Sequence, residues 1–241
     1  MRIVVGGILH ERWTVNECLD ALFDLDTKGH EVVYAWVVDG SCQRKLPGTV
    51  VRVDGLEGLH YRRQNETKDT LRRIYERLAC LRNILAQTAL SLDGEALFSV
   101  DSDIVVPRST LLDLVDADYP WVAALVQNAV GSNRIWNVFH LKRENGLISH
   151  FMCTGVGAQG DRWPEKRLWT YDPRDSDEEQ DLVAGAVCLY GRPLLLKARW
   201  CSTPRGSQED IGFGLNALEA GYHAGYVPIV CKHLTIGGTN G

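Results

Sequence analysis

The 241-residue sequence lacks any apolar run long enough to cross a membrane. A spanning helix needs about 20 consecutive apolar residues, whereas the wholly apolar runs here are short, as at 121–126. The first residues also lack the long apolar core and the cleavage site of a signal peptide. The sequence therefore predicts no transmembrane anchor and a cytoplasmic location.

Closely spaced cysteines and excess positive charge are missing too. The seven cysteines include no C-x-x-C pair, which excludes the usual zinc-knuckle and dithiol redox motifs. Lys and Arg number 26 against 31 Asp and Glu, a formal net charge of -5. Because proteins that bind duplex nucleic acid normally carry an excess of positive charge, no such partner is expected.

No Pro- or Ser-rich linker divides the chain, which has 45% hydrophobic and 24% charged residues. This composition is that of an ordinary globular protein, and a chain of this length can bury a sizeable core. We therefore expect one domain over residues 1–241.

A strand–helix–strand unit opens the sequence. β-Branched runs at 3–5 and 31–38 flank apolar residues with helical spacing at 14–29. Such a unit implies parallel strands, with ligands at their carboxyl ends, here residues 10–13 and 39–41. The pattern predicts an α/β fold with a mostly parallel central sheet flanked by helices.

Both ends of this first helix carry signals of their own. Thr14 and Glu17 form a capping-box pattern, in which each side chain bonds a backbone N–H of the first turn. Gly29 suits the left-handed conformation that often follows a helix. The pattern therefore predicts a helix from Thr14 to Gly29.

A longer helix is predicted at 67–89, where apolar residues follow the three-four spacing. Arg82 falls inside the apolar stripe, whereas Arg73 and Arg77 point away from it. A buried arginine needs an anionic partner, either a protein carboxylate or a ligand phosphate. Taken alone, the pattern favours the carboxylate.

The rest of the chain continues the alternation of strands and helices. Further strands are predicted at 96–100, 121–126, 135–141, 147–153, 182–190 and 226–230, and short helices from Ser109, Pro193 and Ser207. Between them, residues 161–181 hold eight acids and four bases and are predicted to form a mobile, solvated loop.

Asp101 and Asp103 directly follow the predicted buried strand 96–100. Three other D-x-D pairs lie in or after helices or in the acidic loop, away from the sheet's ligand-binding edge. Two acids at this edge repel each other, and a Mg²⁺ or Mn²⁺ ion relieves the repulsion while offering sites to diphosphate oxygens. The alternative is that both acids cap the helix near Ser109 or face water.

Several short motifs together resemble a glycosyltransferase of the GT-A fold, broadly similar to family 2. They are Val-Val-Asp39-Gly, Leu-Arg82-Asn83, Leu-Phe-Ser-Val-Asp101-Ser-Asp103, Val183-Ala-Gly185-Ala186, Gln208-Glu209-Asp210 and His233. Each motif is short, so the specificity lies in their order and spacing over essentially the whole chain. The resemblance implies a single GT-A (Rossmann-like) domain over 1–241, with a nucleotide-binding half at 1–106 and an acceptor-binding half at 107–241.

The resemblance also implies roles for individual residues. The metal ligands would be Asp101, Asp103 and His233, with Asp101 contacting the ribose or reaching the metal through water. The nucleotide sugar would lie against Gly7, His10, Arg12, Asp39, Arg82, Asp101 and Gly185. Asp210 would act as general base on the acceptor hydroxyl, and Glu209 would bond the acceptor or support the helix start.

The implied activity is metal-dependent transfer of a sugar from a UDP or GDP donor to an acceptor hydroxyl, with inversion. The cofactor would be Mn²⁺ or Mg²⁺, and the acceptor a small molecule, glycan, lipid or peptide. A weaker similarity to mannosyltransferases of the mannan-polymerase type, which use GDP-mannose, leaves retention of configuration open.

Three other functions were weighed from the residues. A sugar-phosphate nucleotidyltransferase would share the nucleotide fold, but it usually carries a Lys-containing glycine loop after the first strand, and none is present at 6–12. A non-catalytic sugar- or nucleotide-binding module stays open. The G-x-G-x-x-G at 155–160 fits a dinucleotide site poorly, because Pro164 and missing periodicity argue against a following helix.

Overall fold

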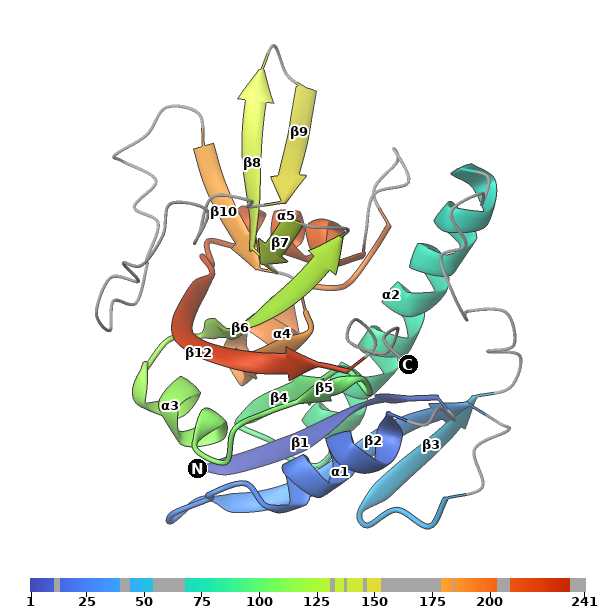
Figure 1. Ribbon diagram of the computed structural model, residues 1–241, viewed down its shortest axis with the longest axis vertical. Coiled ribbons are helices and arrows are strands. Elements are labelled where there is room, and N and C mark those ends of the chain that lie inside the picture. Colours follow the sequence, from blue (N-terminus) through green and yellow to red (C-terminus); the bar gives the residue numbers. More distant parts are fainter. Residues whose placement is uncertain are drawn as a thin grey trace.

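The computed structural model describes residues 1–10, 14–39, 44–53, 68–130, 133–136, 138–144, 147–152, 179–183, 185–202 and 209–234. The main sheet contains β1 (Arg2–Leu9), β2 (Glu31–Asp39), β3 (Thr49–Val53), β4 (Ala96–Val100), β5 (Ile104–Val105), β6 (Trp121–Val130), β7 (Asn133–Trp136), β11 (Val187–Gly191) and β12 (Gly225–His233). A smaller antiparallel sheet contains β8 (Val138–Glu144), β9 (Leu147–Met152) and β10 (Glu179–Val183) (Figure 1).

The main sheet is mixed. Its order is β3-β2-β1-β4-β11-β6-β12-β5, and β7 pairs with β6. Strands β3, β2, β1 and β4 run parallel, whereas β11 is antiparallel to both β4 and β6. The expected α/β fold is confirmed. The sheet is parallel from β3 to β4 and contains antiparallel pairs beyond β4.

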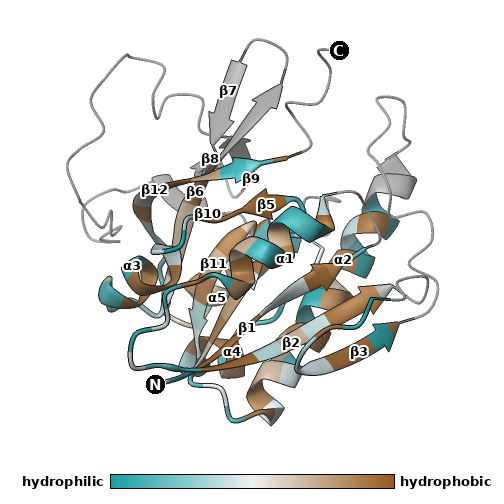
Figure 2. Cartoon of the chain, turned by 60° about the horizontal axis from the view of Figure 1, so that its bottom comes forward, coloured by the Kyte–Doolittle hydropathy of each residue, from teal (hydrophilic) through white to brown (hydrophobic). Residues whose placement is uncertain are grey.

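Helices cover both faces of this sheet. On one face, α1 (Val15–Phe23) and α3 (Thr110–Asp116) pack over one set of strand side chains, such as Val5 and Phe98. On the other face lie α2 (Lys68–Ser91), α4 (Arg192–Lys197) and α5 (Glu209–Glu219). Because successive strand residues point to opposite faces, uninterrupted apolar strands such as β4 feed both cores. Figure 2 shows these apolar strands inside and polar helix surfaces outside.

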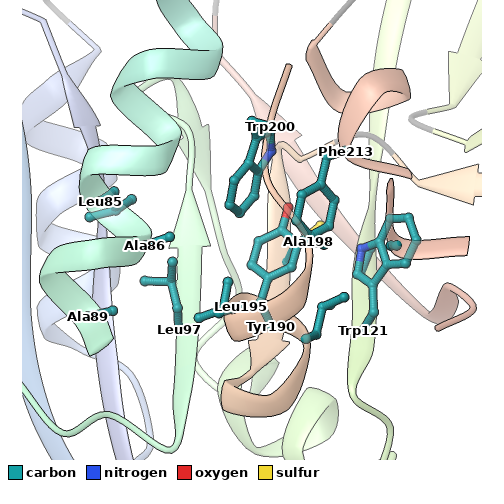
Figure 3. Close-up of a cluster of buried hydrophobic side chains, with 14 of the residues drawn as sticks. Leu85, Ala86, Ala89, Leu97, Trp121, Tyr190, Leu195, Ala198, Trp200 and Phe213 are labelled. Carbon is teal, nitrogen blue, oxygen red and sulfur yellow. The ribbon is translucent and has the colours of Figure 1, made fainter. Parts of the chain in front are cut away.

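An aromatic cluster fixes α5 on its face of the sheet (Figure 3). Phe213 of α5 stacks on Trp200 with ring centroids 4.0 Å apart. Phe213 also packs edge-to-face with Tyr190 and Trp121, with ring centroids 5.3 and 5.4 Å apart. Such pairs are favourable beyond their buried area, so the start of α5 is held at a defined place relative to β11.

The chain changes direction across the sheet at β1. It passes from β1 to β2 and β3 on one side, then returns to β4 on the other side of β1. Ligands of open α/β sheets bind at such a switch point, outside the carboxyl ends of the strands. Here those ends are followed by His10 and Asp101.

The first helix is shorter than predicted. It ends at Phe23, and Gly29 adopts its positive φ of 77° in the turn before β2 instead. Thr14 already has helical dihedral angles and makes no side-chain capping bond, so the predicted capping box is wrong.

Three other boundaries differ. The strand predicted at 182–190 is two strands, β10 and β11, which belong to different sheets. Residues 179–181 of the predicted acidic loop belong to β10, and the rest of that loop lies outside the described residues. The strand β3 was not predicted, because its short pattern of exposed and half-buried residues gives little periodic signal.

The strand predicted at 135–141 is likewise divided between β7 and β8, which belong to different sheets. Confirmed elements include α2, β2, β4 and β12. None of the helices within the described ranges is long and apolar enough to span a membrane.

Candidate active site

Three hydrogen bonds to the backbone of Asp101 hold the acidic turn after β4. The N–H of Asp101 donates to the carbonyl of Ala186 at 2.9 Å, which ties the turn to the start of β11. The carbonyl of Asp101 accepts from the N–H of Ile104 at 3.1 Å and from Sγ of Cys18 on α1 at 3.5 Å. These bonds fix the direction in which the side chains of Asp101 and Asp103 leave the sheet edge.

The C-terminal strand brings His233 to this turn. β12 pairs with β5, so His233 lies opposite Ile104, and the N–H of Leu234 donates to the carbonyl of Asp103 at 2.8 Å. The pairing of β12 with β6 shifts register between Val227 and Val230, around Pro228. A proline cannot donate a ladder bond, which accounts for an irregularity there.

Asp103 and His233 face each other. Nε2 of His233 lies 3.8 Å from Oδ2 of Asp103, and the two side chains are 17% and 21% exposed. Burial lowers the pKa of His233, while the nearby Asp103 carboxylate opposes that shift. A neutral imidazole beside a carboxylate offers two lone pairs of the kind that bind divalent metals.

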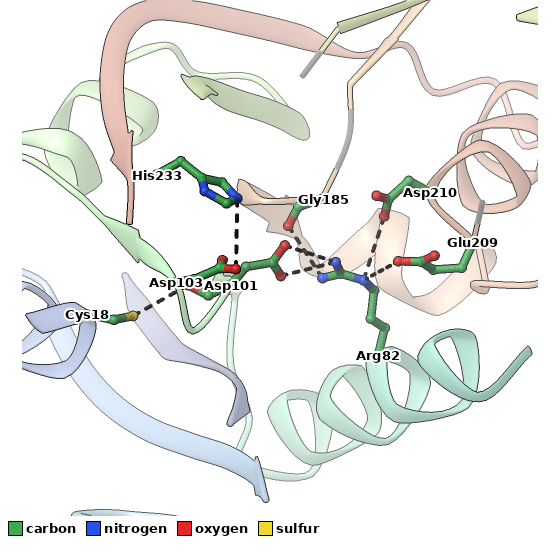
Figure 4. A network of polar contacts seen from close by, with 8 residues as sticks. All are labelled: Cys18, Arg82, Asp101, Asp103, Gly185, Glu209, Asp210 and His233. Carbon is green, nitrogen blue, oxygen red and sulfur yellow. Dashed lines mark hydrogen bonds and ion pairs between the residues drawn. The ribbon is translucent and has the colours of Figure 1, made fainter. Parts of the chain in front are cut away.

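Arg82 is the central cation of the site (Figure 4). It is 6% exposed on α2. Its Nη2 donates to Oδ1 of Asp101 at 3.1 Å, its Nη1 to the carbonyl of Gly185 at 3.4 Å, and its Nε to Oε1 of Glu209 at 3.2 Å. The predicted burial of Arg82 is confirmed, and it bonds protein carboxylates, the kind of partner that the pattern favoured. The contact with Glu209 was not predicted.

Glu209 and Asp210 open α5 as its first two residues. Both are buried, and Oδ1 of Asp210 lies 3.7 Å from Nε of Arg82, too far for a hydrogen bond. That oxygen has no hydrogen-bond partner within the described residues. The helix N-terminus favours negative charge at both positions, but Glu209 bonds Arg82 whereas the buried Oδ1 of Asp210 makes no hydrogen bond to the described residues.

The site holds more negative than positive charge. The carboxyl groups of Asp101, Glu209 and Asp210 share one guanidinium, and Asp103 lies beside them. Burial raises the pKa of Asp101 to about 7, opposed by Arg82 and reinforced by Asp103. Burial likewise raises the pKa of Glu209 to about 7, with Asp210 adding to the shift. Another cation would relieve this excess.

Two glycines allow the close approach of these segments. A Cβ on Gly185 would lie 2.7 Å from Oδ1 of Asp210 and 3.2 Å from Cζ of Arg82. A Cβ on Gly7 would lie 2.2 Å from the carbonyl oxygen of Val100, just before the acidic turn. Both positions therefore require glycine for packing. This requirement is separate from the donor contacts that the sequence predicted for them.

The residues present fit a divalent cation that is completed by other ligands. The 3.8 Å between the donors of Asp103 and His233 is longer than a hydrogen bond and shorter than twice a metal–ligand distance of about 2.0–2.2 Å. No three His, Cys, Asp or Glu side chains in the described part of the chain converge into a metal cage. Mg²⁺ commonly binds one or two carboxylates plus substrate phosphates rather than an all-protein cage.

The remaining predicted residues are partly described. His10 is half-buried immediately after β1. Asp39 ends β2, but its side chain, like Arg12 and the G-x-G-x-x-G at 155–160, lies outside the described residues. Sequence reasoning missed Asn83, whose side-chain amide bonds the backbone of Trp200 at 2.8 and 3.0 Å. Its place next to Arg82 was the available signal.

Comparison with known proteins shows the fold. No protein-family model and no curated protein sequence matches the chain. Among solved structures, the glycosyltransferase TarS of S. aureus is similar with a TM-score of 0.55 at 14% identity, over 98% of this chain and 37% of that chain. The mannosyltransferase PcManGT from Pyrobaculum calidifontis, in complex with GDP-Man and Mn²⁺, gives 0.49 at 15% identity over 98% and 58%.

The chain has a GT-A-like fold, as the motifs predicted. It spans 37% of the TarS chain and 58% of the PcManGT chain. At identities of 14% and 15% the likeness concerns the fold, and a fold by itself does not define a function.

Proposed function

We propose that this protein is a metal-dependent glycosyltransferase, which moves a sugar from a nucleotide-diphosphate donor to an acceptor hydroxyl with inversion of configuration. One observation carries the proposal: three carboxyl groups, of Asp101, Glu209 and Asp210, surround the guanidinium of Arg82, and a fourth, that of Asp103, lies beside Asp101 and faces His233. Such an excess of negative charge suits a site that binds a cation together with an anionic diphosphate.

The donor side is built on the acidic turn. Asp103 and His233 would hold Mn²⁺ or Mg²⁺, and Asp101 would contact the ion through water or bond the ribose. A cation held there supplies positive charge next to the diphosphate as it departs. Asp103 and His233 would hold the ion, while the Arg82 guanidinium restrains the Asp101 side chain.

The nucleotide of UDP or GDP would lie along the carboxyl ends of β1 and β4. Gly7 and His10 come from β1 and the residue after it, and Gly185 comes just before β11, beside the carboxyl end of β4. Arg12 and Asp39 are proposed to complete this part of the donor site. Main-chain and polar side-chain contacts of this kind orient a ligand in a mostly apolar crevice.

Asp210 is the proposed general base. Its carboxylate takes the proton from the acceptor hydroxyl as that oxygen bonds the anomeric carbon. The bond from this carbon to the diphosphate oxygen breaks, and the nucleoside diphosphate leaves with the bonding electrons. The proposal is supported by Figure 4, where the Arg82 guanidinium lies between Asp210 and the acidic turn.

A donor screen tests the proposed function. The protein is incubated with a panel of UDP- and GDP-sugars, Mn²⁺ and a set of acceptors, and nucleoside diphosphate release is measured. We expect one donor to be consumed and also to raise the unfolding temperature. Inversion is checked by the NMR coupling constant of the product's anomeric proton. Absence of both turnover and stabilisation with every donor would contradict the proposal.

Asp210→Asn tests the base. The variant should bind donor with unchanged affinity and lose at least about a hundredfold in kcat, because proton transfer by a positioned base contributes roughly 10²–10⁴-fold. Glu219→Gln, an exposed acid at the other end of α5, is the matched control and should keep full activity. Normal turnover by Asp210→Asn would refute the base assignment.

A further inference from the structure

We infer that Arg82 is a positioning residue that links the donor side of the site to its acceptor side. The charge at Glu209 and the affinity of Asp103 and His233 for a divalent cation should then depend on each other. The inference rests on the proposed function and adds a coupling between its two halves.

The first observation is the geometry of the guanidinium. Its nitrogens reach the turn after β4, the turn before β11 and the start of α5, segments that lie 19, 103 and 127 residues away in sequence. The group is planar and rigid, so its donors cannot turn independently. A shift toward Asp101 therefore lengthens the contact with Glu209.

The second observation is the shortage of positive charge. Two carboxylates bond Arg82 directly, at 3.1 and 3.2 Å, and Asp210 lies 3.7 Å away. In this buried setting one cation shared by several anions is divided among them. Neutralising Glu209 leaves more of the Arg82 charge to Asp101, and the acidic turn then attracts a second cation less strongly.

The third observation is the rigid support of Arg82. The next residue, Asn83, bonds both the N–H and the carbonyl of Trp200. Trp200 in turn stacks on Phe213 of α5. The backbone at Arg82 is thus held against the same layer that carries Glu209, so a change at one end is transmitted through the guanidinium and is not absorbed by movement of α2.

The test is a cycle of variants read by Mn²⁺ binding. Free Mn²⁺ is measured by electron paramagnetic resonance during titration of the whole protein without nucleotide. We expect Glu209→Gln to weaken Mn²⁺ binding by about fivefold or more, the usual lower range for coupled sites. Glu219→Gln removes the same charge from an exposed position of α5 and should change the affinity less than twofold.

Arg82→Lys decides whether the effect passes through Arg82. A lysine keeps the charge but lacks the rigid planar fork that joins Asp101 to Glu209, so Glu209→Gln should change Mn²⁺ affinity less than twofold in that background. If Arg82→Lys does not fold, Asp101→Asn replaces it, because this change cuts the same link on the donor side. If Glu209→Gln weakens Mn²⁺ binding equally in the wild type and in the Arg82→Lys (or Asp101→Asn) variant, the inference is overturned.

Activity gives a separate readout. In a protein that transfers sugar, Arg82→Lys should lower kcat by at least tenfold at saturating Mn²⁺ and donor, since the linkage aligns Asp101 and Glu209. An unchanged kcat would overturn the inference. A wild-type protein that binds Mn²⁺ neither alone nor together with UDP or GDP would instead refute the proposed function.

Discussion

Gly185 is a residue whose replacement should disturb the site. Its missing side chain lets the carbonyl reach Arg82 while Asp210 passes close by. Gly185→Ala would place a Cβ 2.7 Å from the Asp210 carboxylate, and we expect a loss of about 1–3 kcal/mol in the free energy of unfolding, as for other overpacked sites. Denaturant unfolding measures this loss.

The control for this change is Gly191→Ala. A Cβ there would meet its nearest atom at 3.4 Å, an ordinary contact, and φ is -68°. Its unfolding free energy should stay within about 0.5 kcal/mol of the wild type. Equal stability of the two variants would show that the tight approach at Gly185 is not a constraint.

The raised pKa of Glu209 should make the stability of the protein depend on pH. Its pKa is raised by burial from 4.5 to about 7, so the folded chain holds a proton that the unfolded chain releases between these values. The contribution of Glu209 therefore becomes less favourable as pH rises from about 4.5 to 7, by roughly 3 kcal/mol at most. Glu209→Gln, which resembles the neutral acid, should gain stability relative to wild type over this interval.

Unfolding with urea at about pH 5.5 and pH 8, with chelator present, measures the stability gap between the two proteins. Relative to wild type, Glu209→Gln should have a higher free energy of unfolding at about pH 8 than at about pH 5.5. The exposed control Glu219→Gln should show no such difference. A gap that is the same at both pH values would mean that Glu209 is ionised throughout.

At the scale of elements, Asn83 joins α2 to the chain segment that follows α4. Its amide pairs with both backbone groups of Trp200, much as a neighbouring strand would. Asn83→Ala should cost about 2 kcal/mol in unfolding free energy, because it leaves both groups without their partner. Gln87→Ala, exposed on the same helix, should cost less than about 0.5 kcal/mol. Equal costs would contradict the role of Asn83.

Elements with strong periodicity could be predicted from the sequence, and those decided by tertiary contacts could not. The helix α2 follows its apolar stripe, and β4 is a wholly buried strand bounded by polar residues. The residues 182–190 gave one apolar run, yet they divide between two sheets, and the carbonyl of Gly185 between the two strands accepts a bond from Arg82. Local spacing contains no information on that contact.

At the scale of the whole molecule, one sheet carries strands from both halves of the chain. Its order places β4 next to β11, and β12 returns to pair with β5 beside the acidic turn. The sequence located Asp101 and Asp103 because they directly follow a buried strand. Only the resemblance to GT-A glycosyltransferases pointed to His233, and nothing in the sequence predicted that Arg82 bonds Glu209, 127 residues away.

The central claim is that the acidic turn and His233 bind a divalent cation that holds the donor diphosphate. Isothermal titration of UDP and GDP with and without Mn²⁺ tests it directly, with Asp103→Asn as the variant and Asp113→Asn, on helix α3, as its control. The account predicts that one nucleotide binds wild type and control only with Mn²⁺ and binds Asp103→Asn at least tenfold more weakly. Nucleotide binding that is independent of Mn²⁺ and unchanged in Asp103→Asn would contradict it.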